Sequence, residues 1–179
     1  MALDGIFLHC LQREIADGAV GDRVDKIHQP TKEEIVLTLR GRSGAKKLLL
    51  SCRPDSARVH FTDYAPENPA RPPMFTMLLR KLLQGARLDD VTQPGLERVL
   101  ELHFTSTNEL GDRVTYRLVI EILSRYANIL LLDGNGKIID CIRRMTGENG
   151  NRRLLPGVDY TLPPVSYTHL RAHETELHL

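Results

Sequence analysis

The side chains in this sequence that are best suited to chemistry are basic residues that recur at the edges of predicted strands and helices. They are Arg80, Lys81, Arg87, Arg98, Arg113, Arg117, Arg125, Arg143, Arg144, Arg152 and Arg153. Spaced guanidinium groups can bridge phosphates along a groove, while acidic residues elsewhere keep the net charge small. For any one of these residues the alternative is a solvated arginine paired with a carboxylate. Because only 5% of the residues are aromatic, RNA contacts would depend on shape and backbone rather than on base stacking.

Local signals for catalysis are weak. The chain has no G-x-S-x-G motif, and Cys10 follows His9 within a predicted helix, where sequence neighbours point apart. The glycines between positions 41 and 44 lack the GK[ST] ending of a phosphate loop and indicate a hairpin turn. Asp89 and Asp90 stand beside turn residues and are typical of turns or caps. We therefore expect a binding protein rather than an enzyme, with no cofactor.

The last fifteen positions, 165–179, differ from the rest of the chain. Three of the seven histidines lie here, and His169 and His173 have the spacing of one helical face, as in some metal sites. The segment has one residue too many for an HExxH helix, and it offers no obvious third ligand. It also resembles translated sequencing-adapter read-through. We predict a domain over residues 1–164, followed by a non-native or unstructured tail and no metal site.

Composition excludes several classes of protein. Hydrophobic residues make up 41% and charged residues 26% of 179 residues, as expected for one globular domain. The net charge of +1 excludes a polybasic arm or an acidic tail. The longest purely apolar run is 129–132, too short to cross a membrane. Three widely spaced cysteines and an N-terminus without a basic region favour buried, reduced thiols in a cytoplasmic protein.

Residue periodicity predicts an α+β domain. Asp4 begins an amphipathic helix that ends near Gly18, and a second helix with an apolar stripe runs from Pro73 to Gly85. Strands are expected at 23–28, 35–39, 47–50, 57–62, 87–92, 98–106, 114–123, 128–132 and 137–142. In the first of these, Val24 and Ile27 are out of phase, which indicates a bulge or a twist. Short strands in meander order, with two main helices, predict a β-sandwich-like architecture.

Seven motifs in order resemble the N-terminal domain of the NFACT family (NFACT-N), whose bacterial members are RqcH-type proteins often labelled fibronectin-binding protein A. They are DGIFL at 4–8, RVDKIHQP at 23–30, KLLLS at 47–51, PPMFTMLLRK at 72–81, NELGD at 108–112, EILSRYANI at 121–129 and LPG at 155–157. The resemblance covers residues 1–164. It implies a fold similar to the N-terminal domain of formamidopyrimidine-DNA glycosylases. Those enzymes use a proline and a glutamate where this chain has Ala2 and Leu3, so we expect no glycosylase activity.

The resemblance implies a cytoplasmic, ribosome-associated factor for ribosome quality control. Such proteins bind the large ribosomal subunit carrying a stalled peptidyl-tRNA, recruit alanine tRNA and promote template-free C-terminal tailing. The remaining domains of these proteins are absent here, so we expect the front end of a longer protein. Two alternatives remain open: an extracellular adhesin that binds fibronectin or fibrinogen, as the older family name implies, and a glycosylase-like DNA binder.

The resemblance also assigns residues. The family's tRNA-contacting Asp-Arg pair falls on Glu97-Arg98, where glutamate replaces the usual aspartate. We expect Arg98 to contact a phosphate or base edge, and Glu97 to orient it or to accept a donor from RNA. Arg80, Lys81, Arg125 and Asn128 are weaker candidates. For Arg125 and Asn128 the sequence leaves open whether they touch RNA or hold a turn.

Overall fold

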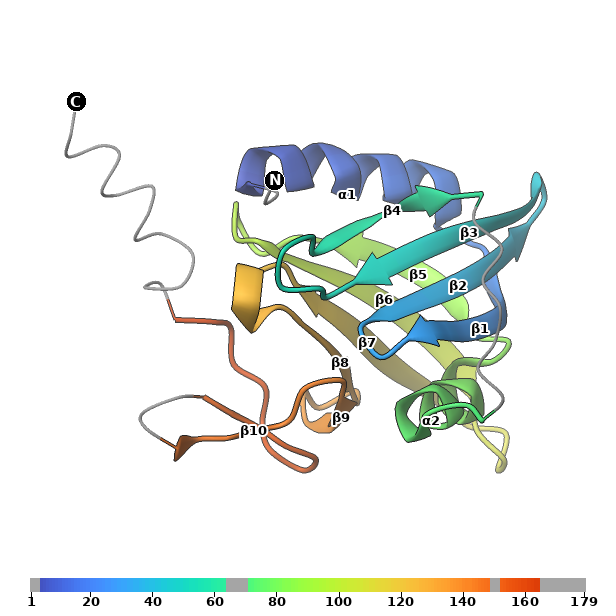
Figure 1. Ribbon diagram of the computed structural model, residues 1–179. Helices are drawn as coiled ribbons and strands as arrows, with labels where there is room; N and C mark the ends of the chain where they lie inside the picture. Colours follow the sequence, from blue (N-terminus) through green and yellow to red (C-terminus); the bar gives the residue numbers. More distant parts are fainter. Residues whose placement is uncertain (1–3, 64–70, 149–151, 165–179) are drawn as a thin grey trace.

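The computed structural model describes residues 4–63, 71–148 and 152–164 of the chain. Within these ranges, strands β1 to β9 form one antiparallel sheet in the order β4-β3-β2-β1-β5-β6-β7-β8-β9, and two α-helices pack on it (Figure 1). This confirms the predicted α+β class. The likeness to formamidopyrimidine-DNA glycosylases stays a prediction, and so does the tail at 165–179, which lies outside the described residues.

The first half of the sheet is a meander that follows helix α1 (Gly5–Ala19). It consists of β1 (Arg23–Thr31), β2 (Glu34–Gly41), β3 (Gly44–Ser51) and β4 (Arg58–Thr62). Asp4 caps α1 by accepting a hydrogen bond from the Phe7 amide at 2.7 Å, as predicted. Of the bulge or twist predicted in β1, a register shift between Val24 and Lys26 shows the bulge.

The second half follows helix α2 (Met74–Leu83). Its strands are β5 (Arg87–Thr92), β6 (Val99–Thr107), β7 (Arg113–Glu121), β8 (Asn128–Leu132) and β9 (Ile138–Cys141), with the short 3₁₀ helix η1 (Ser124–Tyr126) between β7 and β8. Two further strands of two residues each, β10 (Met145–Thr146) and β11 (Arg153–Leu154), pair with each other. Sequence periodicity missed both, because two residues are too few to show alternation.

The two halves share one hydrophobic core. The strands β1 and β5 are in register at a single pair, Arg23 with Arg87, so the two halves of the sheet are only narrowly joined there. Apolar side chains of both helices and of strands from both halves nevertheless belong to one buried cluster. The strands β1 to β9 thus form one continuous antiparallel sheet that shares this cluster, and the β-sandwich-like description stays a prediction. Leu131 is fully buried in this cluster, as predicted.

The cysteines correct one prediction. Cys52 and Cys141 are buried free thiols, and burial raises the pKa of Cys52 to about 11, so that it stays protonated. Cys10, in contrast, is exposed, so the prediction that it is buried was wrong. It lies on the face of α1 that points away from the core positions Leu8 and Ile15.

Candidate nucleic-acid interface

The predicted pair Glu97-Arg98 lies in the loop that joins β5 to β6, here called the Gln93–Arg98 loop. A turn closes it, since the Glu97 amide donates to the Pro94 carbonyl at 3.0 Å. Gly95 has a φ of 54°, in the left-handed region that favours glycine. Both Glu97 and Arg98 are half-buried, and the Glu97 Oε2 and Arg98 Nε atoms are buried.

Contacts with the start of α1 fix the position of this loop. The Gln93 side-chain amide donates to the carbonyls of Gly5, at 2.9 Å, and of Glu97, at 2.7 Å. A Cβ atom on Gly5 would lie 1.8 Å from the Leu96 carbonyl oxygen, so only glycine allows this approach. The DGIFL and PGLER segments, far apart in the sequence, therefore form one unit.

The loop lies beside the segment that follows β7. The Ile122 amide donates to the Arg98 carbonyl at 2.8 Å, which places Arg98 next to the chain that leads into η1. Arg125 in η1 is exposed, and its guanidinium lies 5.0 Å from the centre of the Tyr126 ring. Ser124 has a φ of 53°, which is uncommon for a residue other than glycine. The structure thus places Arg98 and Arg125 on neighbouring segments at one end of the strands β6 and β7.

Asn128 begins β8, directly after η1, but it is only 1% exposed. Its amide nitrogen donates to the Arg143 carbonyl at 2.8 Å, and its carbonyl oxygen accepts from the amides of Arg143, at 3.0 Å, and Ile129, at 2.9 Å. Of the two roles that the sequence left open for Asn128, the structure therefore shows the structural one: it ties the start of β8 to the segment after β9.

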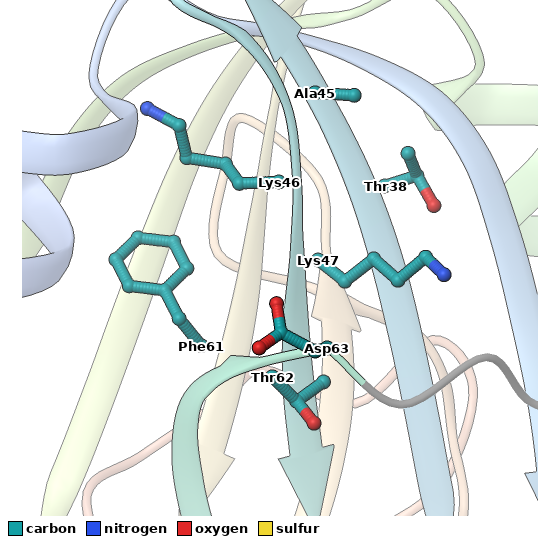
Figure 2. Close-up of a pocket in the computed structure, with 7 residues that line it drawn as sticks. All are labelled: Thr38, Ala45, Lys46, Lys47, Phe61, Thr62 and Asp63. Carbon is teal, nitrogen blue, oxygen red and sulfur yellow. The ribbon is translucent and has the colours of Figure 1, made fainter.

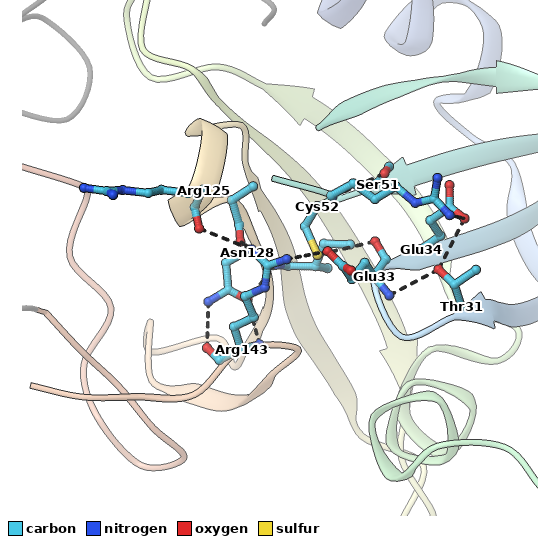
Figure 3. Close-up of polar contacts among 11 residues, drawn as sticks. Thr31, Glu33, Glu34, Ser51, Cys52, Arg125, Asn128 and Arg143 are labelled. Atoms are coloured by element: carbon cyan, nitrogen blue, oxygen red, sulfur yellow. Dashed lines mark hydrogen bonds and ion pairs between the residues drawn. The ribbon is translucent and has the colours of Figure 1, made fainter. Parts of the chain in front are cut away.

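Arg143 also forms hydrogen bonds that hold the segment between η1 and β8 in place (Figure 3). One guanidinium nitrogen donates to the Ala127 carbonyl at 2.9 Å, and the other donates to the Glu33 carboxylate in the turn between β1 and β2. The Arg125 side chain points away from these contacts (Figure 3). Arg143 therefore holds the backbone that presents Arg125. Sequence reasoning had grouped Arg143 with the phosphate-binding arginines and missed this role, because Glu33 is 110 residues away.

Arg80 and Lys81 lie elsewhere. Both belong to α2, which packs on β1, and the Arg80 Nε donates to the Ile27 carbonyl at 3.0 Å. In Figure 1, α2 and η1 (the gold turn between β7 and β8) lie on opposite sides of the view. Arg80 and Lys81 are therefore not part of the group that surrounds Arg98.

A polar cavity that the sequence did not indicate adjoins the Gln93–Arg98 loop. Its volume is about 360 Å³, and its lining consists of Thr92, Gln93, Pro94, Glu101, Arg117, Tyr160 and Leu162. Glu101 lies 3.3 Å from Arg117 and accepts from the Thr92 hydroxyl at 3.2 Å. His103, whose Nε2 lies 3.6 Å from the carboxylate, together with Arg117 and Thr92, holds the pKa of Glu101 below its usual value against the opposing effect of burial. The sequence signal that could have indicated this cavity is the alternation of the polar residues Glu101 and His103 along β6.

Several of the spaced arginines are engaged by carboxylates. Arg117, Arg143, Arg144 and Arg152 pair with Glu101, Glu33, Asp140 and Glu121, respectively. For these four the structure shows the salt-bridged alternative. Within the described ranges, no three His, Cys, Asp or Glu side chains are grouped as metal ligands, and no helix is long and apolar enough to cross a membrane.

Comparison with known proteins defines the class to which this fold and site belong. A family model described as "NFACT N-terminal and middle domains" matches residues 4–176, and the chain belongs to the NFACT family. Among its curated relatives is "Rqc2 homolog RqcH" of Bacillus subtilis, which is 42% identical over 166 residues. The alignment covers 92% of this chain but 29% of that protein, so the chain spans under a third of the relative's length.

Two solved structures share the fold. The N-terminal domain of fibronectin-binding protein PavA from Streptococcus pneumoniae has a TM-score of 0.86 and 39% identity, covering 91% of this chain and 65% of that one. The N-terminal part of the fibronectin/fibrinogen-binding protein from Streptococcus suis has a TM-score of 0.87 and 39% identity, covering 91% and 62%. The predicted family is thereby confirmed, and the chain is related to proteins of ribosome quality control.

Proposed function

We propose that this chain is the tRNA-contacting N-terminal domain of an RqcH-type ribosome quality-control factor. The observation that carries the proposal is the placement of Arg98. In a chain of the NFACT family, Arg98 lies half-buried on a braced loop, next to the segment that presents the exposed Arg125. A guanidinium on a fixed loop suits phosphate and base-edge recognition, because little conformational freedom is lost on binding.

In this proposal the domain acts by binding and not by catalysis, and it uses no cofactor. The longer protein binds the large ribosomal subunit that carries peptidyl-tRNA, recruits alanine tRNA and promotes template-free alanine tailing in the cytoplasm. Arg98 supplies a charged donor to the tRNA, while Glu97 orients Arg98 or accepts a donor from the RNA. The Glu97 side chain is one methylene longer than the aspartate usual in the family but keeps the negative charge.

A second candidate function is adhesion to fibronectin or fibrinogen. The names of the two solved structures favour it, since both proteins are described as fibronectin-binding. In that case the partner would be an extracellular protein, and the RNA recovered with the full-length protein would be nonspecific.

One experiment separates the two candidates. The full-length protein is crosslinked in cells of its native host, lysates are separated on sucrose gradients, and the bound RNA is sequenced. The proposal expects sedimentation with large subunits and enrichment of one or a few tRNAs over their cellular abundance. Recovery on the cell surface, with no large-subunit peak and no tRNA enrichment, would support adhesion instead.

A further inference from the structure

A second group of basic side chains lies far from Arg98, on one face of the strands β1, β2 and β3. The strand register aligns Lys26 in β1 with Thr38 in β2, and Thr38 with Lys47 in β3. Directly paired residues of adjacent strands project from the same face of a sheet. Lys26, Thr38 and Lys47 therefore form one row across three strands, on the face opposite to the core residues Leu37 and Leu39.

Helix α2 adds Arg80 beside this row. The hydrogen bond from Arg80 Nε to the Ile27 carbonyl holds the guanidinium against β1, one residue from Lys26. His28 lies two residues from Lys26 on β1 and therefore on the same face of the strand. Burial first, and then the charges of Arg80, Lys26 and Lys47, lower the pKa of His28. We call Lys26, Lys47 and Arg80 the basic surface.

Among the described residues, the basic surface has no carboxylate in an ion pair with Lys26, Lys47 or Arg80. Other basic side chains of the same half-sheet are paired: Arg40 with Asp25 at 3.2 Å, Lys46 with Asp22 at 3.6 Å, and Arg53 and Arg58 with Glu34. Neighbouring cations that are not paired with carboxylates repel one another, and a bound anion would relieve that repulsion.

A cavity of about 320 Å³ opens beside the row (Figure 2). Lys47, Thr38 and Asp63 are among the residues that line it, and Asp63 is the one carboxylate in its described lining. Thr38 is 7% exposed, and its hydroxyl has no hydrogen-bond partner among the described residues. A buried polar group without a partner is uncommon in proteins, and a bound anion could accept a hydrogen bond from this hydroxyl. In Figure 2 the Lys47 side chain extends from β3 across β2, toward the side of Thr38.

We propose that the basic surface binds backbone phosphates of RNA, as a second contact in addition to Arg98. This inference rests on the proposed RNA-binding function. Lys26 and Lys47 lie two strands apart, which is about 10 Å. The phosphates of a nucleic-acid backbone repeat along the chain and can contact both lysines of such a row. One small anion could contact only one of them. Contacts of this kind position the RNA and carry no sequence preference.

The test measures salt dependence in the full-length protein. The probes are an alanine tRNA transcript and protein-free large-subunit rRNA, titrated at several KCl concentrations. Each lost phosphate contact lowers the slope of log affinity against log salt by about 0.7 to 0.9. The double variant Lys26→Ala/Lys47→Ala should therefore lower the slope by about 1 to 2 for at least one probe and weaken its binding by about 3- to 30-fold. Lys26→Arg/Lys47→Arg, which keeps both charges, should retain the slope.

Controls make the result specific. Lys32→Ala/Lys137→Ala removes the same charge from two exposed sites near other turns and should change the slope by less than the test variant does. Asp63→Asn, which removes the carboxylate of the cavity, should strengthen binding. An unchanged slope and affinity for both RNAs in the Lys26→Ala/Lys47→Ala variant would overturn the proposal. An equal loss in the control double variant would also overturn it.

Arg98→Ala, measured in parallel, separates this inference from the proposed function. If Arg98→Ala abolishes tRNA binding and the lysine variant binds both RNAs as the parent does, the RNA-binding role of the basic surface is refuted and the proposed function stands. If the lysine variant lowers the slope and Arg98→Ala binds tRNA normally, the basic surface stands and the assignment of Arg98 is wrong.

Discussion

Arg152 and Glu121 form a two-point ion pair in the interior of the protein. The two guanidinium nitrogens lie 2.9 and 3.0 Å from the two carboxylate oxygens, and the Glu121 side chain is fully buried. The Tyr160 hydroxyl donates to the same carboxylate at 2.6 Å. Burial and the Glu121 charge raise the pKa of Tyr160, so its hydroxyl stays a donor. This pair fastens the segment that contains β11 and Tyr160 to the end of β7.

We predict that Arg152→Ala lowers the free energy of unfolding by about 3–5 kcal/mol, because it leaves a buried carboxylate without its partner. Arg153→Ala is the matched control, since Arg153 is exposed, and should cost less than about 0.5 kcal/mol. Urea denaturation of both variants measures the difference. A cost for Arg152→Ala as small as that of the control would show that the pair contributes little.

Arg143 and Arg144 offer a second matched comparison. Arg143 joins Glu33 to the Ala127 carbonyl, whereas Arg144 pairs with Asp140 and its side chain is 55% exposed. Arg143→Ala should lower the free energy of unfolding by about 1.5–3 kcal/mol, the usual worth of hydrogen bonds to charged groups. Arg144→Ala should stay within about 0.5 kcal/mol of the parent. Similar denaturation midpoints for the two variants would contradict the bracing role of Arg143.

The ionisation of Glu101 makes the stability of the folded protein depend on pH. Its pKa in the folded protein lies below its ordinary value of 4.5, so the folded state favours the ionised carboxylate. Its contribution to stability is fully present above pH 4.5 and is lost as the pH falls through the lowered value. Glu101→Gln should therefore lose less stability between about pH 5 and pH 3 than the parent. Asp89, whose pKa is also lowered, keeps part of the acid dependence.

Thermal melts of Glu101→Gln and the parent across this pH range provide the measurement. Parallel curves for the two proteins would show that Glu101 has no part in the acid loss.

Leu131 tests the placement of the core. It is fully buried in the cluster that unites the two halves of the sheet. Leu131→Ala should lower the free energy of unfolding by about 2–5 kcal/mol, because it removes apolar contacts and leaves a cavity. Chemical denaturation gives the value, and a cost below about 1 kcal/mol would contradict the assigned core face.

The fold was predictable where local patterns specify it. Asp4 and the apolar spacing of α1 and α2 indicate the helices, and the turn residues at 41–44 and 133–136 mark two hairpins that the structure contains. The site was only partly predictable. The side chains of Arg117, Arg143 and Arg152 look alike in the sequence, and only the fold shows that each meets a carboxylate, which lies 16, 110 and 31 residues away, respectively. The sequence did not indicate that Lys26 and Lys47 lie in one row, because the strand register that aligns them is a tertiary property.

We propose above all that Arg98 contacts tRNA. Copurification of tRNA with the full-length protein tests this contact most directly. Arg98→Ala should reduce tRNA recovery by about ten- to a hundredfold at fixed salt, the effect of losing one charged contact worth about 1.5–3 kcal/mol. Large-subunit binding and the melting temperature should stay close to those of the parent. Glu97→Asp, which restores the usual family pair, should retain tRNA. Glu97→Ala should be milder if Glu97 only orients Arg98, and as severe if its carboxylate accepts a donor from the tRNA. Undiminished tRNA recovery with Arg98→Ala would contradict the claim, and a collapsed melting curve would show that Arg98 is structural instead.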